Sequence, residues 1–401
     1  MNPMTRWTCF LGLLLLGCAS SNPGPERCTG ERTYRGPTRR SAPESVWPKL
    51  AAQRSLTGAL DAGLTQALDT ALDSVLKHVP AASVAVALPG EGLWTATRGV
   101  ARTDTREAVG PDSLFQVASV TKSFTAVLVS QLAREGRLSL DAPVSTWFPQ
   151  VQGAESMTVA DLLEHTHGLV SFNALPGFED GPHHAPEELI QVAAEHPRQF
   201  CPGTNWAYSN TGYVMLGRIL EQVEGKPFAD LLQERIAGPL GLTHSRMRTV
   251  DAPLPQVVSG HLAGAPITQV DYATPYAAGS LASRAEDLVR FWHALMSGAL
   301  LPMDTVQRMF QDMHSMDVMY PPSQPGNTMS YGRGVQLYEV PQGPGLMLGH
   351  SGGIQGFTSV MAWLPEDDAF VAVIFNDNQV AAEAGLWALV RALREHRSAR
   401  P

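Results

Sequence analysis

Residues 115–122 of the chain read Phe115-Gln116-Val117-Ala118-Ser119-Val120-Thr121-Lys122. A hydroxyl and an amine three residues apart share one face of a helix, with Cβ atoms about 5–6 Å apart. The chain has only four lysines, and a buried lysine can lose its proton, whereas arginine cannot. The Ser119–Lys122 spacing therefore predicts an activated serine nucleophile at the start of a helix.

The same spacing occurs a second time, at Ser74 and Lys77. That pair lies in a segment whose leucines recur every four residues, which is the pattern of an amphipathic helix covering a core. These leucines are Leu56, Leu60, Leu64, Leu68, Leu72 and Leu76. At most one of the two pairs can be catalytic, so the spacing alone does not identify the site.

The first residues of the chain have the pattern of an exported protein. An apolar run from Phe10 to Leu16 is short for a membrane span and suits a signal-peptide core. The run ends in Leu15-Leu16-Gly17-Cys18, which resembles the lipobox of bacterial lipoproteins. We expect residues 1–17 to be a signal peptide and Cys18 to carry a lipid that anchors the protein to a membrane of the cell envelope, facing the periplasm or the surface. An ordinary secretory signal cut nearby is the alternative.

Residues 18–50 are rich in Pro, Gly, Ser and Arg and contain few large apolar side chains. This composition predicts a lipidated, flexible tether. Once Cys9 is removed with the signal and Cys18 is acylated, Cys28 and Cys201 are the remaining thiols. Export permits a disulfide between them, but Cys28 falls in the predicted tether, so two free thiols with Cys201 buried are favoured.

Residues 51–401 have the composition of one globular domain without internal repeats, in a chain that is 44% hydrophobic. The net charge of −9 and the lack of basic clusters argue against nucleic-acid binding. Strand patterns lie near both ends of this domain, and a closing helix follows the last strand. The expected strands span 83–88, 93–97, 345–350, 357–364 and 370–375, and the closing helix spans 381–395.

Helical patterns and loops dominate the middle of the domain. They span 158–165, 187–194, 210–223, 228–236 and 285–296. We therefore predict an α/β (α+β) fold in which an antiparallel sheet, built from about 55–118 and 330–401, is flanked by N- and C-terminal helices. A mainly helical lobe of about 119–329 is inserted, and an active site between the lobes is expected.

Two further motifs carry chemistry. Tyr208-Ser209-Asn210 offers a phenol and an amide, which matter because no Asp–His pair is evidently arranged to serve Ser119. His350-Ser351-Gly352-Gly353 closes a predicted strand, where glycines would let a substrate backbone approach and would leave backbone amides accessible.

Together these motifs resemble the family of class C β-lactamases, serine D-alanyl-D-alanine carboxypeptidases and related esterases and D-aminopeptidases. The resemblance covers about residues 55–395, and in one segment His167 replaces the serine that is usual in the family. The matching segments are, in order, residues 111–115, 138–144, 162–169, 200–204, 239–242, 278–281 and 349–353. The resemblance implies the β-lactamase/transpeptidase-like fold for this domain.

The same resemblance implies catalytic roles. Ser119 would be the nucleophile, and Lys122 would hold a proton network with it. Tyr208 would be the general base, as a phenolate stabilised by Lys122, because a phenol with its ordinary pKa of about 10 is a poor base at neutral pH.

Substrate binding is implied for the remaining motif residues. Asn210 would orient the substrate, and the backbone amides of Ser119 and Gly353 would form the oxyanion hole. His350, Ser351 and Gly352 would belong to the same substrate-binding strand. His350 stands where the β-lactamases usually have lysine, and histidine there is common among the peptidases and esterases of the family.

The implied function is a serine hydrolase that forms an acyl-enzyme on an ester, a D-amino-acid peptide or a β-lactam-like amide, without cofactor. His350 favours esters and D-peptides over β-lactams. A penicillin-recognising binding or sensor lipoprotein with slow deacylation, and an inactive lipoprotein that uses the cleft for a partner, are the alternatives. No metal site is predicted. His165 and His167 lie in a segment that has a counterpart in the family, and His183 and His184, with Glu179 and Asp180 nearby, lie in a Gly/Pro loop that lacks a second ligand set at metal spacing.

Overall fold

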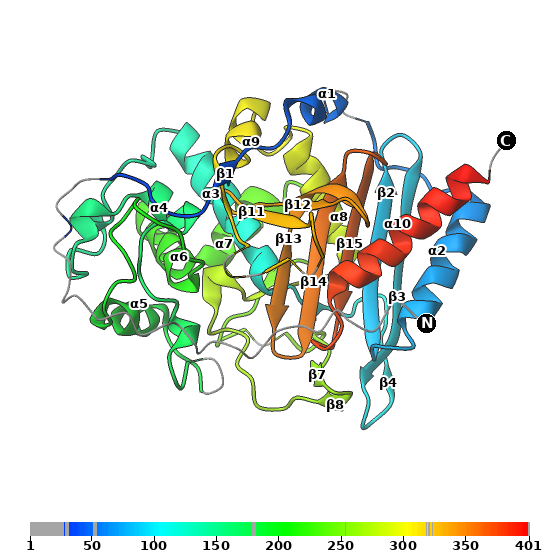
Figure 1. The fold of residues 1–401 in the computed structure, drawn as a ribbon. Coiled ribbons are helices and arrows are strands. Elements are labelled where there is room, and N and C mark those ends of the chain that lie inside the picture. The colour runs from blue at the N-terminus through cyan, green and yellow to red at the C-terminus, as the bar shows by residue number, and fades with distance from the viewer. Residues whose placement is uncertain are drawn as a thin grey trace.

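The computed structural model describes residues 28, 32–50, 54–178, 182–252, 254–317, 319, 321–322 and 324–399. Over these residues the main sheet has ten antiparallel strands in the order β1-β10-β11-β12-β13-β14-β15-β2-β3-β4 (Figure 1). Their bounds are Arg39–Arg40 (β1), Ala81–Leu88 (β2), Gly92–Arg102 (β3), Glu107–Ala108 (β4), Met313–Ser315 (β10), Thr328–Tyr331 (β11), Gln336–Val340 (β12), Gly345–Ile354 (β13), Phe357–Leu364 (β14) and Ala369–Phe375 (β15). The sheet thus unites both ends of the domain, as predicted.

The central strands β2, β14 and β15 are buried along their whole length. Their side chains alternate between two cores, because successive residues of a strand point to opposite faces. In β2, Val84 and Val86 enter one core, whereas Ala85 and Ala87 enter the other. Both faces must therefore be covered by helices, which explains why these strands are continuous apolar runs.

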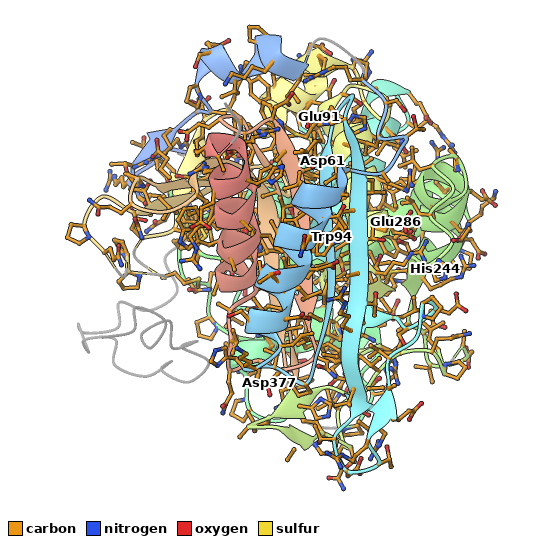
Figure 2. All side chains as sticks on the ribbon, turned by 90° about the vertical axis from the view of Figure 1, so that its right-hand side faces the viewer. Asp61, Glu91, Trp94, His244, Glu286 and Asp377 are labelled. Atoms are coloured by element: carbon orange, nitrogen blue, oxygen red, sulfur yellow. A yellow bond between two sulfur atoms is a disulfide. The ribbon has the colours of Figure 1, made fainter. Side chains whose placement is uncertain are left out.

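Two helices, α2 (Ala62–Val75) and α10 (Ala382–Ser398), cover the first face side by side (Figure 2). Their leucines pack on the sheet together with Trp94 of β3, which lies beside α2 in Figure 2. The leucine pattern begins at Leu56, but the helix begins only after Asp61, whose side chain caps its first turn by accepting a hydrogen bond from the Leu64 amide.

The other face carries α8 (Ala285–Met296), which contacts β2, β14 and β15, and beyond it the helical lobe (Figure 1). At the centre of the lobe, α3 (Thr121–Arg134) buries nearly its whole circumference. The other helices are α1 (Trp47–Leu50), α4 (Val159–Glu164), α5 (Pro186–Glu195), α6 (Asn210–Glu224), α7 (Phe228–Leu232), which continues into a π-helical turn at Gln233–Ala237, and α9 (Met303–Met309). No helix among the described residues has the length and apolarity needed to cross a membrane.

Small sheets connect the lobes. Strand β5 (Phe115–Gln116), immediately before Ser119, pairs with β9 (Leu281–Ser283), and β9 pairs with β6 (Arg246–Met247). A further pair joins β7 (His261–Leu262) to β8 (Ala265–Pro266). The β5–β9 pairing fixes the chain just before the predicted nucleophile.

The predicted tether is wrong for residues 32–50. Strand β1 pairs with β10, the Tyr34 hydroxyl lies 2.7 Å from Nδ1 of His314, and Arg32 pairs with Asp161 at 2.5 Å. Backbone pairing of so short a strand and pairs of polar side chains leave no trace in apolar composition, which is why this packing escaped prediction. Residues 18–27, including Cys18, lie outside the described residues.

The prediction of two free thiols is also wrong. Cys28 and Cys201 form a disulfide with their Cα atoms 5.6 Å apart, across 173 residues of sequence. The prediction assumed that Cys28 belongs to a flexible stretch, whereas the segment that follows it from Arg32 is held on the domain. The disulfide joins this N-terminal segment to the loop that precedes Tyr208.

Candidate active site

Ser119 lies in a short 3₁₀ turn, Ala118–Val120, that leads directly into α3. Ala118 has a φ of +47°, in the left-handed region that is unusual for a residue with a Cβ. Val117 and Val120 are fully buried, whereas Ser119 is only partly buried and lines a pocket. The strained turn therefore brings the hydroxyl to the pocket while the flanking residues stay in the core.

Lys122 is fully buried one turn further along the same helix. Its Nζ donates hydrogen bonds to Ser119 Oγ at 3.0 Å and to the Ala278 carbonyl at 2.7 Å. Burial lowers the pKa of Lys122 well below its usual value, and no carboxylate of the described residues forms an ion pair with it. The site thus favours a neutral amine beside the serine hydroxyl, which is able to accept a proton.

Tyr208 reaches the same oxygen from the segment that precedes α6. Its hydroxyl donates to Ser119 Oγ at 2.9 Å, and the Lys122 Nζ lies 4.9 Å from the centre of its ring. The structure therefore brings the three predicted catalytic side chains together at one atom.

His165 supports Tyr208, although the sequence indicated it only as part of a matching segment. Its ring is fully buried and lies 4.3 Å, centre to centre, from the Tyr208 ring, and its Nδ1 accepts a hydrogen bond from the Ser209 amide at 3.2 Å. Burial lowers the pKa of His165 well below its usual value. A neutral His165 thus holds the backbone beside Tyr208.

The pocket in front of Ser119 combines apolar walls with a few polar groups. Asn210, the first residue of α6, lines it, and its Nδ2 donates to Asn173 Oδ1 at 2.8 Å. The lining residues are Ala118, Ser119, Phe172, Asn173, Phe178, Pro182, Asn210, Val270, Asp271, Thr274, Pro275, Ala278, Gly279, Gly353, Ile354 and Gln355. Asn173 and Asp271 were missed from the sequence, because no motif spacing links them to Ser119.

Strand β13 forms one wall of the pocket. A Cβ added at Gly352 would lie 2.9 Å from the Ser119 amide nitrogen and closer still to the Val117 carbonyl oxygen. The same addition at Gly353 would meet nothing within 4 Å. Gly352 therefore permits the strand to approach the nucleophile turn, rather than a substrate as predicted, and Gly353 lies open on the pocket wall.

The other two residues of this motif are absent from the pocket wall. His350 is fully buried, and burial lowers its pKa to about 3, so its ring is neutral at physiological pH. Its Nδ1 lies 2.6 Å from the Ser351 carbonyl oxygen and its Nε2 3.3 Å from the Tyr331 hydroxyl. The Ser351 amide donates to Gln336 Oε1 at 2.7 Å. Among the described lining residues, only Asn210 and Gly353 of the predicted binding set are thus in position to touch substrate directly.

The second Ser–Lys pair lies elsewhere. Ser74 belongs to α2 and Lys77 follows that helix, where the lysine is exposed to solvent. The pair is therefore separated by the main sheet from the lobe that holds Lys122. In the described part of the chain, no group of three or more His, Cys, Asp or Glu side chains is arranged to hold a metal ion.

The chain is similar in sequence to a known protein family and to several characterised proteins. The family described as Beta-lactamase matches residues 68–395. The chain is 30% identical over 319 residues to penicillin-binding protein 4 of Amycolatopsis lactamdurans, which covers 75% of this chain and 81% of that protein. It is 33% identical over 200 residues to the esterase EstB of Burkholderia gladioli, across 45% of this chain and 51% of the esterase.

The fold is shared with a solved enzyme. The D-amino acid amidase of Ochrobactrum anthropi SV3, in its complex with L-phenylalanine amide, aligns with a TM-score of 0.73 at 29% identity, over 84% of this chain and 100% of the amidase. These similarities agree with the mixed α/β fold and its large antiparallel sheet. The chain belongs to the beta-lactamase family and is a serine hydrolase of that fold.

Proposed function

We propose that Ser119 forms an acyl-enzyme with an ester or amide substrate, that Lys122 accepts the hydroxyl proton and that Tyr208 passes a proton to the leaving group. The observation that carries this proposal is the buried Lys122 amine 3.0 Å from Ser119 Oγ. An amine of lowered pKa is a suitable base at neutral pH. We therefore assign the first proton transfer to Lys122, where the family resemblance implies a Tyr208 phenolate.

The proposed reaction has two balanced halves. Ser119 Oγ attacks the carbonyl carbon and gives its proton to Lys122, and the bond to the alcohol or amine breaks as that leaving group takes a proton delivered through Tyr208. Water then attacks the acyl-enzyme, and the acid departs as Ser119 regains its proton. The hydrogen bonds of Lys122 and Tyr208 to the same Ser119 oxygen support a proton path between them.

The negative oxygen formed in each half needs donors. The Ser119 amide lies against β13 at Gly352, and Gly353 lines the pocket. We propose that the Ser119 and Gly353 amides form the oxyanion hole, where each donor contributes about 3–4 kcal/mol. Asn210, held by Asn173, would orient the substrate from the opposite wall.

Esters and D-amino-acid amides or peptides are the proposed substrates, in preference to β-lactams. The esterase and the D-amino acid amidase among the similar proteins support this choice. A penicillin-binding protein is also similar, so a slow-turnover sensor is the competing function.

A single experiment separates these functions. Purified protein is mixed with a chromogenic cephalosporin, a nitrophenyl ester and a D-amino-acid amide, while product and intact mass are followed over time. The proposal predicts product with a transient mass increase, and faster turnover of an ester or D-amide than of the cephalosporin. A persistent adduct without turnover would establish a sensor, and β-lactam turnover above that of every ester and D-amide would contradict the substrate choice.

We also propose that the protein is an exported lipoprotein held on a membrane of the cell envelope through Cys18. The lipobox-like Leu15-Leu16-Gly17-Cys18 supports this, and so does the Cys28–Cys201 disulfide, since disulfides persist in oxidising compartments. Labelling of cells with an alkyne fatty acid tests it. The full chain should incorporate the label and Cys18→Ser should not, whereas equal labelling would exclude this anchor.

A further inference from the structure

Asp271 is the one charged residue among the described residues that line the Ser119 pocket. The other lining side chains are neutral polar groups or apolar groups, and no Lys or Arg of the described chain lines it. Asp271 retains 23% of its side-chain exposure. Among the described lining residues, Asp271 is therefore the group whose charge a substrate would meet.

The carboxylate is fixed by three neighbours. Oδ1 accepts from the Ala273 amide at 2.9 Å, and Oδ2 accepts from Thr274 Oγ1 at 2.9 Å and lies 2.6 Å from Nδ1 of His183. Burial raises the pKa of Asp271, but these hydrogen bonds outweigh burial and lower it below its usual value. Asp271 is therefore ionised at neutral pH and held in one position.

The three bonds leave room for another donor. An ionised carboxylate has about four acceptor positions, so Oδ1 retains one after it accepts from the Ala273 amide. A protonated amine could use it, and a charge-assisted bond of this kind is stronger than a neutral one. A substrate carboxylate in the same place would face Asp271 without a compensating cation among the described lining residues.

We propose that Asp271 binds a protonated amine of the substrate, so that the enzyme acts on esters or amides of amino compounds that lack a free carboxylate beside the scissile bond. The apolar walls formed by Phe172, Phe178 and Ile354 suit an aromatic or aliphatic side chain on the same substrate. This inference rests on the proposed hydrolase function and adds to it a recognised chemical group and the residue that recognises it.

Three methyl esters that differ at one position provide the probes: phenylalanine methyl ester in each enantiomer, methyl 3-phenylpropionate and monomethyl benzylmalonate. They carry an amine, a hydrogen and a carboxylate at the same carbon. The wild-type enzyme should hydrolyse at least one enantiomer of the amino ester with kcat/KM about 10- to 100-fold above the ester without an amine. The carboxylate ester should be the poorest of the three.

Asp271→Asn should remove this preference, chiefly by raising KM for the amino ester, so that the ratio of kcat/KM for the amino ester to that for methyl 3-phenylpropionate falls toward 1. His183→Gln is the matched control, because it removes the neighbour and keeps the carboxylate, so the preference should survive. If Asp271→Asn instead lowers the rates of both esters equally, Asp271 only holds the loop together and the inference is wrong.

If Asp271→Asn does not fold, inhibition of the wild-type enzyme still tests the inference. Phenethylamine should inhibit hydrolysis of methyl 3-phenylpropionate at a concentration at least about 10-fold below that of 3-phenylpropanoate. Equal inhibition, or hydrolysis of the ester without an amine as fast as that of both amino esters, overturns the inference alone. Absence of Ser119-dependent hydrolysis of every ester and amide tested overturns the proposed function and this inference with it.

Discussion

Two regions of the molecule share a serine and a lysine three residues apart, and their surroundings differ completely. Lys122 is fully buried beside the Ser119 hydroxyl, whereas Lys77 is exposed at the end of a helix that covers the far face of the sheet. Burial lowers the pKa of Lys122 because a charged amine without a carboxylate partner is poorly solvated there. The same spacing therefore places a serine near a lysine in both regions, but only burial gives the lysine a lowered pKa.

The largest expected effect comes from removing each lysine in turn. Lys122→Met should lower kcat/KM for an ester by about 10²- to 10⁴-fold, which is the usual contribution of a positioned base. Lys77→Met, at the exposed pair, should leave activity within about 2-fold of wild type, because nothing at Lys77 touches the pocket. Steady-state kinetics on both purified variants measures this, and equal losses would remove the distinction between the two regions.

The second pair of variants tests the contact between β13 and the turn Ala118–Val120 that holds Ser119. The Ser74 pair on α2 has no such contact. Gly352→Ala should lower kcat by about 10²-fold, because its Cβ would push the strand away from the Ser119 amide. Gly353→Ala is the control, since its Cβ meets nothing within 4 Å. Kinetics with circular dichroism distinguishes loss of geometry from unfolding, and a Gly353→Ala defect as large as that of Gly352→Ala would contradict the assignment.

Of the two regions compared, the disulfide supports only the one with Ser119 and Lys122, because it holds the loop that precedes Tyr208. Changing both Cys28 and Cys201 to Ser should lower the free energy of unfolding by about 2–4 kcal/mol, since a cross-link over 173 residues restricts the unfolded chain. Urea unfolding followed by tryptophan fluorescence tests this. No loss of stability would mean that the other contacts of residues 32–50 hold the segment by themselves.

The last effect is a pH dependence of stability that only the buried lysine should produce. Burial lowers the pKa of Lys122 in the folded protein below its value near 10.4 in the unfolded chain. At a pH between these two values the unfolded chain binds more protons than the folded protein, so Lys122 lowers the free energy of unfolding. This cost becomes smaller as the pH rises. The free energy of unfolding of Lys122→Met should therefore exceed that of the wild type by the largest amount near pH 7, and this excess should decline toward pH 10.5. A difference independent of pH would mean that Lys122 is charged in the folded protein, and Lys77→Met should show no such trend.

The regular elements were largely predictable, because their patterns are local. The predicted strand 357–364 and helix 285–296 coincide with β14 and α8, where apolar side chains follow the period of the element. The meeting of Ser119, Lys122 and Tyr208 was predictable as well, from motifs in a recognisable order. Each of these features is encoded within a few neighbouring residues.

Features that depend on distant partners were not predictable. Strand β1 uses backbone groups that any composition provides, and the disulfide joins residues 173 positions apart. Asn173 and Asp271 reach the pocket from loops without a motif. His350 was expected to contact substrate, but its position in β13 directs it into the buried layer with Tyr331. The positions of these residues depend on tertiary contacts with distant parts of the chain, which local sequence spacing does not encode.

If Ser119 is the nucleophile, then Ser119, and not Ser74, carries the acyl group during turnover. Wild-type protein turning over a nitrophenyl ester is quenched with acid, digested and mapped by mass spectrometry, in parallel with Ser119→Ala and Ser74→Ala. The acyl mass should lie on the peptide that contains Ser119, persist in Ser74→Ala and disappear, together with activity, in Ser119→Ala. An acyl group on the Ser74 peptide, or full activity in Ser119→Ala, would show that Ser119 is not the nucleophile.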